Sequence, residues 1–199
     1  FSLLTNDIVY NPADQLIYAS VPSAAGSIGN SVAAINPATG LVGQPIFIGS
    51  EPYKLALSDT GNILYTTLGG APRVRKLDLT TKTPGIQFGL GSDVTRGPFY
   101  GEHIAVAPGN PDVVAVSTYL LPILGGTGVV LANNGVVLPN KAAGNSLAFS
   151  GSHLFTYTND FTEFGLRKLA MTSNGLSQVN FTTNLINGFG QRVVAANGK

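Results

Sequence analysis

The sequence contains no cysteine and no tryptophan among its 199 residues, and it has only two histidines. The absence of cysteine excludes disulfides, thiolate metal sites and cysteine nucleophiles. Metal sites need two or three histidine or carboxylate ligands that converge, and no local spacing around His103 or His153 supplies them. We therefore predict no metal site, and we interpret His153 as an ordinary surface residue in a turn.

Charge is also scarce, because Asp, Glu, Lys and Arg together make up 11% of the residues and the formal net charge is +1. The longest basic cluster lies at 73–76, and we interpret it as a solvated strand face. Nucleic-acid binding requires a concentrated positive surface, so no polynucleotide partner is expected. No apolar run reaches the length of a membrane-spanning helix. The sequence also lacks a phosphate loop, a dinucleotide fingerprint, a calcium loop and a serine-nucleophile elbow, so no cofactor is predicted.

Turn-forming residues are abundant, with 25 glycines and 12 prolines. They surround the stretch 51–67, EPYKLALSDTGNILYTT, which has the pattern of two short strands joined by a tight turn. Apolar residues alternate in Lys54–Leu57, Asp59–Asn62 has turn chemistry, and Ile63–Thr67 is rich in β-branched and aromatic residues. This stretch therefore predicts a β-hairpin.

The hairpin pattern recurs along the chain. Its copies begin near residues 6, 102, 145 and 191, and they align on Ile8, Leu55, Ile104, Leu147 and Val193. The steps between the aligned residues are 47, 49, 43 and 46, and each unit carries a second, weaker hairpin. Four short strands in about 46 residues is the size of a β-propeller blade. The sequence therefore predicts an all-β propeller of four-stranded antiparallel blades, with no helix.

Two phrases in the first half of the chain resemble a known family. NSVAAINPATG at 30–40 and IFIGSEPYKLALSDTGNILYTT at 46–67 are similar to the YVTN type of propeller repeat, which occurs in bacterial and archaeal surface proteins and in lactonase-like seven-bladed propellers. The resemblance extends over roughly residues 6–80. It implies a protein that is secreted, periplasmic or on the cell surface, but it implies no single activity, because this repeat serves many roles.

The repeats predict a single, partial propeller over 1–199. Its blades are expected at about 6–50, 51–97, 98–144 and 145–188, with the start of a fifth at 189–199. A seven-bladed ring at this period needs about 320 residues, so we expect the chain to be part of a larger propeller, mature or trimmed at Phe1. The alternative is a closed four-bladed ring with one extra closing strand. Open blade edges favour self-association.

One mouth of the central channel is the predicted site. In a propeller the first strand of each blade lies nearest the axis, so the residues at its start converge. The two residues before each aligned position can all form hydrogen bonds: Asn6, Asp7, Tyr53, Lys54, Glu102, His103, Asn145, Ser146, Gln191 and Arg192. A water-filled channel with a polar lip is one interpretation, and a site for a polar ligand is the other. The ligand-binding candidates are Asp7, Tyr53, Lys54, Tyr100, Glu102, His103, Asn145, Gln191 and Arg192.

The leading hypothesis for function is a non-enzymatic binding scaffold, exported or on the cell surface, whose partner is an unidentified protein or a small polar ligand. Its contact surfaces would be the mouth and the connections at 22–30, 89–101 and 119–127, because long connections on a rigid scaffold often carry function. The connection at 119–126 is apolar, so it either packs on the next blade or contacts a hydrophobic partner. Another alternative is a structural repeat module of a larger envelope protein.

A lactonase-like hydrolase is the second hypothesis. Glu102 and His103 would then serve as general acid or base. The other candidates would hold an oxygen or stack on a ligand ring: Lys54 and Arg192, and Tyr53 and Tyr100. The sequence shows no lactonase motif beyond the repeats, so the resemblance assigns no catalytic role.

Overall fold

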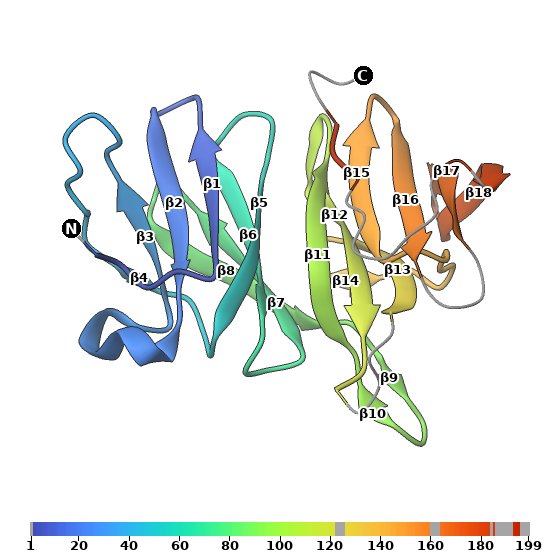
Figure 1. The fold of residues 1–199 in the computed structure, drawn as a ribbon, viewed down its shortest axis with the longest axis horizontal. Helices are drawn as coiled ribbons and strands as arrows, with labels where there is room; N and C mark the ends of the chain where they lie inside the picture. The colour runs from blue at the N-terminus through green and yellow to red at the C-terminus, as the bar shows by residue number, and fades with distance from the viewer. Residues whose placement is uncertain (1, 122–125, 160–163, 184, 186–192, 196–199) are drawn as a thin grey trace.

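The computed structural model describes residues 2–121, 126–159, 164–183, 185 and 193–195. These residues form four four-stranded antiparallel sheets and one small two-stranded sheet. The four large sheets stand in a row in chain order (Figure 1). The prediction of an all-β chain built from four-stranded antiparallel units is confirmed.

Each large sheet takes its four strands in chain order. The first two sheets consist of β1 (Asp7–Asn11), β2 (Leu16–Val21), β3 (Ser31–Ile35), β4 (Ile46–Phe47), β5 (Pro52–Leu57), β6 (Ile63–Leu68), β7 (Arg73–Asp78) and β8 (Thr83–Gly89). The last two consist of β11 (Tyr100–Ala107), β12 (Asn110–Tyr119), β13 (Gly126–Asn133), β14 (Val136–Val137), β15 (Ser146–Ser150), β16 (His153–Asn159), β17 (Phe164–Thr172) and β18 (Gly175–Thr183). Sheets of this kind need only short turns between strands, which accounts for the many glycines and prolines.

The hairpin predicted at 51–67 is formed by β5 and β6. The Ser58 N–H donates to the Ile63 carbonyl at 2.9 Å and closes the turn. Gly61 has a φ of 72°, which glycine adopts without steric cost. A Cβ at Gly61 would also collide with Asn11 of the first sheet, whose Nδ2 donates to the Gly61 carbonyl at 2.9 Å. Glycine therefore lets the turns of neighbouring sheets touch.

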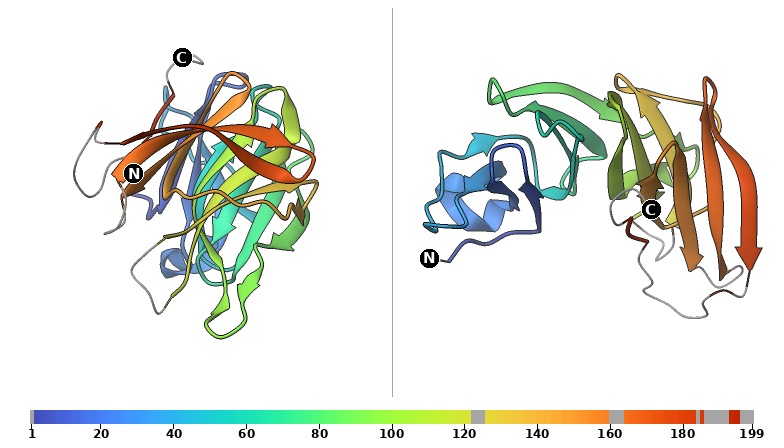
Figure 2. Two further views of the ribbon diagram at one scale, coloured as in Figure 1. Left: turned by 90° about the vertical axis from the view of Figure 1, so that its right-hand side faces the viewer. Right: turned by 90° about the horizontal axis from the view of Figure 1, so that it is seen from above.

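The first strands of successive sheets lie side by side. β1 contacts β5, β5 contacts β11, and β11 contacts β15. The views in Figure 2 show the sheets following one another around these strands. The residues at the start of these strands therefore approach one another along one edge of the molecule.

A hydrophobic cluster fills each interface between neighbouring sheets, and burial of such apolar surface contributes about 25 cal/mol per Å². Between the first and second sheets it includes Tyr18, Val32, Leu55, Leu64 and Leu77. Between the second and third it includes Tyr65, Val74, Phe88, Val114 and Val116, and between the third and fourth Ala115, Leu131, Leu147, Leu154 and Leu169. Consecutive residues such as Leu64 and Tyr65 enter different clusters, because strand side chains alternate between the two faces. The strands are therefore apolar on both faces.

Two connections contain regular structure that the sequence did not predict. Ser23–Ile28 forms a short 3-10 helix, η1, so the prediction of no helix was wrong at 22–30. An element of this length is too short to show a helical period in the sequence. The connection 89–101 contains a small hairpin of β9 (Ser92–Asp93) and β10 (Gly97–Pro98). Its turn is held by Asp93 Oδ1, which accepts from the N–H groups of Thr95 and Arg96 at 2.9 and 3.0 Å.

The apolar connection at 119–126 is described only in part. Tyr119 ends β12, and Leu120 is 2% exposed within the cluster between the second and third sheets. Leu121 is 63% exposed. Packing therefore accounts for Leu120, whereas Leu121 remains accessible to a partner.

The fifth predicted unit lies almost wholly outside the described residues, which include only 193–195 from it. The Val193 N–H donates to Ser146 Oγ at 2.7 Å, so this segment lies beside the start of β15. No helix in the described part of the chain is long and apolar enough to cross a membrane.

Candidate functional site

The start of β5 carries a β-bulge that brings two polar side chains to the edge of the second sheet. Pairing with β6 passes from Pro52 and Leu68 directly to Leu55 and Thr66, so Tyr53 and Lys54 together lie opposite Thr67. The Lys54 N–H, which has no strand partner there, donates to Thr67 Oγ1 at 3.1 Å. A bulge of this kind changes the direction of the side chains it carries.

The start of β11 carries a second bulge at the equivalent place. Gly101 pairs with Thr118 and His103 pairs with Ser117, which leaves Glu102 as the extra residue. The His103 N–H donates to Ser117 Oγ at 2.9 Å. A hydroxyl of the second strand therefore satisfies the interrupted backbone in both sheets. In β1 and β15 the pairing is regular at this end.

Lys54 joins the first and second sheets at this edge. Its Nζ lies 3.8 Å from Asp7 Oδ1 and 4.9 Å from the centroid of the Tyr53 ring. The other oxygen of Asp7, Oδ2, accepts from the Leu55 N–H at 3.0 Å. The Lys54 and Asp7 side chains are each 22% exposed. Asp7 is thus occupied on both oxygens by the second sheet.

Glu102 lies near this pair and is partly buried. Burial raises the pKa of the Glu102 carboxyl, and the positive charge of Lys54 opposes that rise in part. Within the described residues, its carboxylate accepts no hydrogen bond and has no cation within 4.0 Å. The Glu102 carboxylate therefore interacts electrostatically with Lys54 but forms no ion pair with it.

Two tyrosines lie beside Glu102. The rings of Tyr100 and Tyr119 have centroids 5.8 Å apart and are tilted by 36°. Burial raises the pKa of the Tyr119 hydroxyl, and electrostatic interactions with Tyr53, Tyr100 and Glu102 raise it further. These interactions place the three rings and the carboxylate in one neighbourhood.

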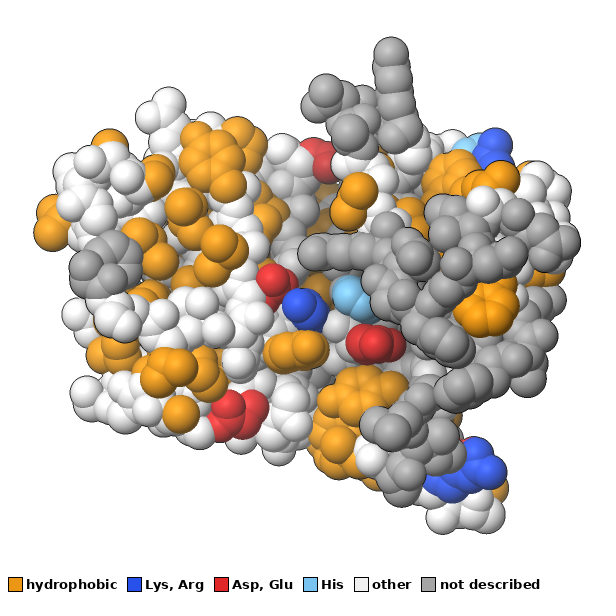
Figure 3. All heavy atoms as spheres, viewed as in Figure 1, with side chains coloured by type: hydrophobic (Ala, Val, Ile, Leu, Met, Phe, Trp, Pro, Cys, Tyr) orange, Lys and Arg blue, Asp and Glu red, His pale blue; other side chains and the backbone are white. Residues whose placement is uncertain are grey.

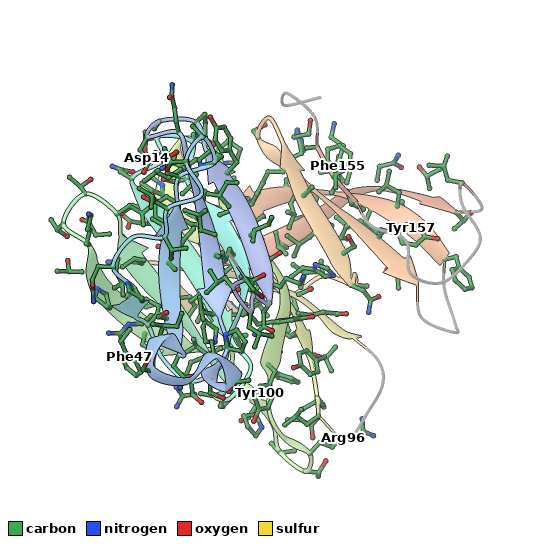
Figure 4. All side chains as sticks on the ribbon, turned by 60° about the vertical axis from the view of Figure 1, so that its left-hand side comes forward. Asp14, Phe47, Arg96, Tyr100, Phe155 and Tyr157 are labelled. Atoms are coloured by element: carbon green, nitrogen blue, oxygen red, sulfur yellow. The ribbon has the colours of Figure 1, made fainter. Side chains whose placement is uncertain are left out.

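We call this group the mouth cluster, and it consists of Asp7, Tyr53, Lys54, Tyr100, Glu102 and Tyr119. With both carboxylates ionised its formal charge is −1. Figure 3 shows acidic, basic, histidine and hydrophobic side chains gathered near the middle of one face, where the second and third sheets meet. Tyr100 lies at the lower end of β11 in Figure 4, whereas Arg96 lies on the β9–β10 hairpin, away from it.

Five of the predicted site residues belong to the mouth cluster, and one, Asn145, lies elsewhere. His103 follows Glu102 on β11 and is partly buried. Asn145 lines a different cleft of about 350 Å³ between the third and fourth sheets, with Thr127, Lys141 and Thr158. No member of the mouth cluster lines that cleft. Gln191 and Arg192 lie outside the described residues.

Sequence reasoning missed Tyr119 and the two bulges. Tyr119 was assigned to an apolar connection, yet it pairs with Tyr100 in the β11–β12 ladder. Two register shifts separate this pair from the turn that joins the strands, so alignment from that turn does not predict it. No local signal marks the bulges, because polar pairs also occur at the start of β1 and β15, where the pairing is regular.

Residues of β5, β11 and β15 also line a cavity of about 340 Å³. Most of the residues that line it are apolar, including Leu57, Ile104, Leu147, Val193 and Val194. Among the described residues, no group of three His, Cys, Asp or Glu side chains could hold a metal ion.

No protein-family model and no curated protein matches this chain. Two solved structures are similar in fold. Hydrazine synthase from Kuenenia stuttgartiensis matches with a TM-score of 0.68 at 14% identity, over 90% of this chain and 49% of that chain. The β-propeller domain of Cps50 (Swd1) from Myceliophteria thermophila matches with a TM-score of 0.68 at 15% identity, over 94% of this chain and 57% of that chain. The fold is that of a β-propeller. The chain spans about half the length of these structures, as a partial propeller does.

Proposed function

We propose that this chain is a binding module, in which successive propeller blades hold the mouth cluster as a contact site for a small polar ligand or a polar segment of a protein. The observation that carries the proposal is the convergence of one ammonium, two carboxylates and three phenol rings from three successive blades. A few polar groups held by rigid strands beside aromatic rings are typical of ligand sites.

A water-filled channel lip does not require this arrangement. Burial disfavours the ionised form of Glu102, and two bulges interrupt strand pairing next to Lys54 and Glu102. Burial of the Glu102 charge lowers the stability of the free protein. The bulges change the direction of the side chains at Lys54 and Glu102. A ligand that uses these groups supplies a physical reason for them.

We also propose that the protein acts outside the cytoplasm, either secreted, in the periplasm or at the cell surface. The support is the similarity of 30–40 and 46–67 to YVTN-type repeats, which we propose as the type of these blades. Cell fractionation should recover the tagged gene product in the medium, the periplasm or the surface fraction, and its restriction to the cytoplasmic fraction would overturn this location. If the chain is instead a structural repeat module, we expect the same location but no ligand binding at the mouth cluster.

A hydrolase related to lactonase-like propellers is a second candidate. The raised pKa of Glu102 favours it. A carboxyl that keeps its proton closer to neutral pH can serve as a general acid or base. His103 follows Glu102 on β11. Hydrolysis of a lactone panel that is lost in Glu102→Ala and His103→Ala would support this activity. Turnover that survives both changes would remove it.

The binding function is tested by nuclear magnetic resonance on the isotope-labelled chain. A panel of neutral sugars, carboxylic acids and organic ammonium salts is titrated, and saturable shifts are expected in amides near Lys54, Glu102 and Tyr119. Lys54→Gln should change that response, because it removes the ammonium that pairs with Asp7. Lys82→Gln, the same change on an exposed turn of the same blade, should not. The proposal fails if no compound shifts these amides, or if both variants respond like the parent.

A further inference from the structure

We propose that the ligand of the mouth cluster is a small organic cation, a primary or quaternary ammonium, held between the Glu102 carboxylate and the rings of Tyr100 and Tyr119. This inference rests on the proposed binding function and names the chemistry of the ligand. It is carried by three properties of the cluster: its charge, its rings and its partial removal from water.

The charges of the cluster do not balance. Lys54 Nζ lies 3.8 Å from Asp7 Oδ1, so the one ammonium is matched by the one carboxylate beside it. Among the described residues, no cation lies within 4.0 Å of the Glu102 carboxylate. The Glu102 charge is therefore left over, and a ligand with one positive charge would neutralise the cluster. An anionic ligand would meet two carboxylates.

The rings of the cluster suit a cation because the face of an aromatic ring attracts positive charge within about 6 Å of its centroid. The cluster already contains one such contact, between Lys54 Nζ and the Tyr53 ring at 4.9 Å. Tyr100 and Tyr119, with centroids 5.8 Å apart and tilted rings, provide two further rings beside Glu102. A carboxylate next to such rings is the combination that binds alkylammonium groups.

The partial burial of Glu102 and Tyr119 favours an organic ammonium ion over a metal ion. Glu102 and Tyr119 are both partly withdrawn from water, and charge attraction is stronger where the surroundings are less polar. A quaternary ammonium loses little hydration on entering such a place. A hard metal ion would instead need several oxygen ligands, and the described residues offer no group of three acidic or histidine side chains for it. An organic cation therefore fits best.

The test compares choline with 3,3-dimethyl-1-butanol, a neutral molecule of nearly the same shape, by titration calorimetry and by amide shifts. The titrations are run at pH 8. We expect choline to bind saturably and at least about tenfold more tightly than the neutral molecule. Glu102→Gln should remove most of this preference. Glu51→Gln, which takes the same charge from the side chain that accepts from Ser23, should keep it.

Two ring variants add a measurement that does not depend on the charge. Tyr119→Phe keeps the ring and should retain choline binding, whereas Tyr119→Leu should weaken it by at least about threefold. Circular dichroism of each variant shows whether it has folded. Equal affinity for choline and the neutral molecule, or unchanged choline binding in Glu102→Gln, would overturn the inference.

The failure of this inference is distinguishable from failure of the binding function. If sugars or carboxylic acids shift the amides of the mouth cluster while choline does not, the cation is wrong and the binding module stands. If no compound of the panel shifts them, both proposals fall.

Discussion

Asp7 and Leu55 are joined by a hydrogen bond across the first two blades, in which the Leu55 N–H donates to Asp7 Oδ2 at 3.0 Å. The same contact recurs where β15 ends the series of first strands: Ser146 Oγ accepts from the Val193 N–H at 2.7 Å. Both acceptors immediately precede an aligned position of the repeat, and both donors are themselves aligned positions. A polar residue at the mouth can therefore hold the next blade in place as well as face the channel.

Replacing Asp7 separates these two roles. Asp7→Ala leaves the partly buried Leu55 N–H without its acceptor and should lower the free energy of unfolding by about 1–3 kcal/mol. Asp7→Asn keeps an oxygen at the same place and should cost less than about 1 kcal/mol, although it loses the attraction to Lys54. Urea unfolding of both variants checks this order. Equal losses would show that charge, rather than the hydrogen bond, joins the blades.

The hydroxyls of Thr67 and Ser117, which accept from the backbone at the two bulges, should contribute to stability. Thr67→Val preserves shape but leaves the Lys54 N–H unpaired, so we expect a loss of about 1–3 kcal/mol and a weaker response of the mouth to ligands. Ser117→Ala should act in the same way on His103. Thr80→Val, at an exposed position of the same blade as Thr67, is the control and should change stability by less than about 0.5 kcal/mol. Unfolding curves in urea give all three values.

The sequence was sufficient for the architecture because the repeat determines it. Ile8, Leu55, Ile104 and Leu147 recur with the spacing of a blade. The burial of Leu55 and Leu147 requires a neighbouring sheet. It was less informative about the mouth, since a bulge depends on which residue of the partner strand faces Lys54, and no local pattern specifies that register. The proximity of Tyr119 to Glu102 similarly depends on pairing between strands.

Glu102 should make stability fall as pH rises. Its folded pKa lies above the ordinary value, so the folded state binds more protons than the unfolded state between those two values, and stability decreases through that window. Glu102→Gln should therefore be more stable than the parent at pH 7, with the difference vanishing below about pH 4. Urea unfolding at both pH values measures it.

Asp78 provides a control of opposite sign for that experiment. Backbone N–H groups of Thr81 and Thr80 lower the pKa of its carboxyl, so the stability it contributes is present above the ordinary pKa and is lost as pH falls through the folded value. Asp78→Asn should be less stable than the parent at pH 7, with the difference shrinking in acid. If Glu102→Gln followed the same pattern as Asp78→Asn, burial would not be the dominant influence on Glu102.

The outer face of the first blade should promote self-association. Ile8 is 58% exposed and Tyr10 is 53% exposed, although Leu55, which aligns with Ile8 in the next blade, is 8% exposed because the first blade covers it. An apolar face built to pack against another blade is left open here. The chain should therefore show a mass that rises with concentration in analytical ultracentrifugation.

Changing that face tests the cause of association. Ile8→Lys should shift the equilibrium toward the monomer by at least about tenfold, because a lysine on this face cannot be buried without its charge being paired. Val94→Lys, at a side chain that is fully exposed on the β9–β10 hairpin, adds the same charge elsewhere and should leave the equilibrium unchanged. A mass that stays monomeric at every concentration, or an equal response to both changes, would show that this face does not drive association.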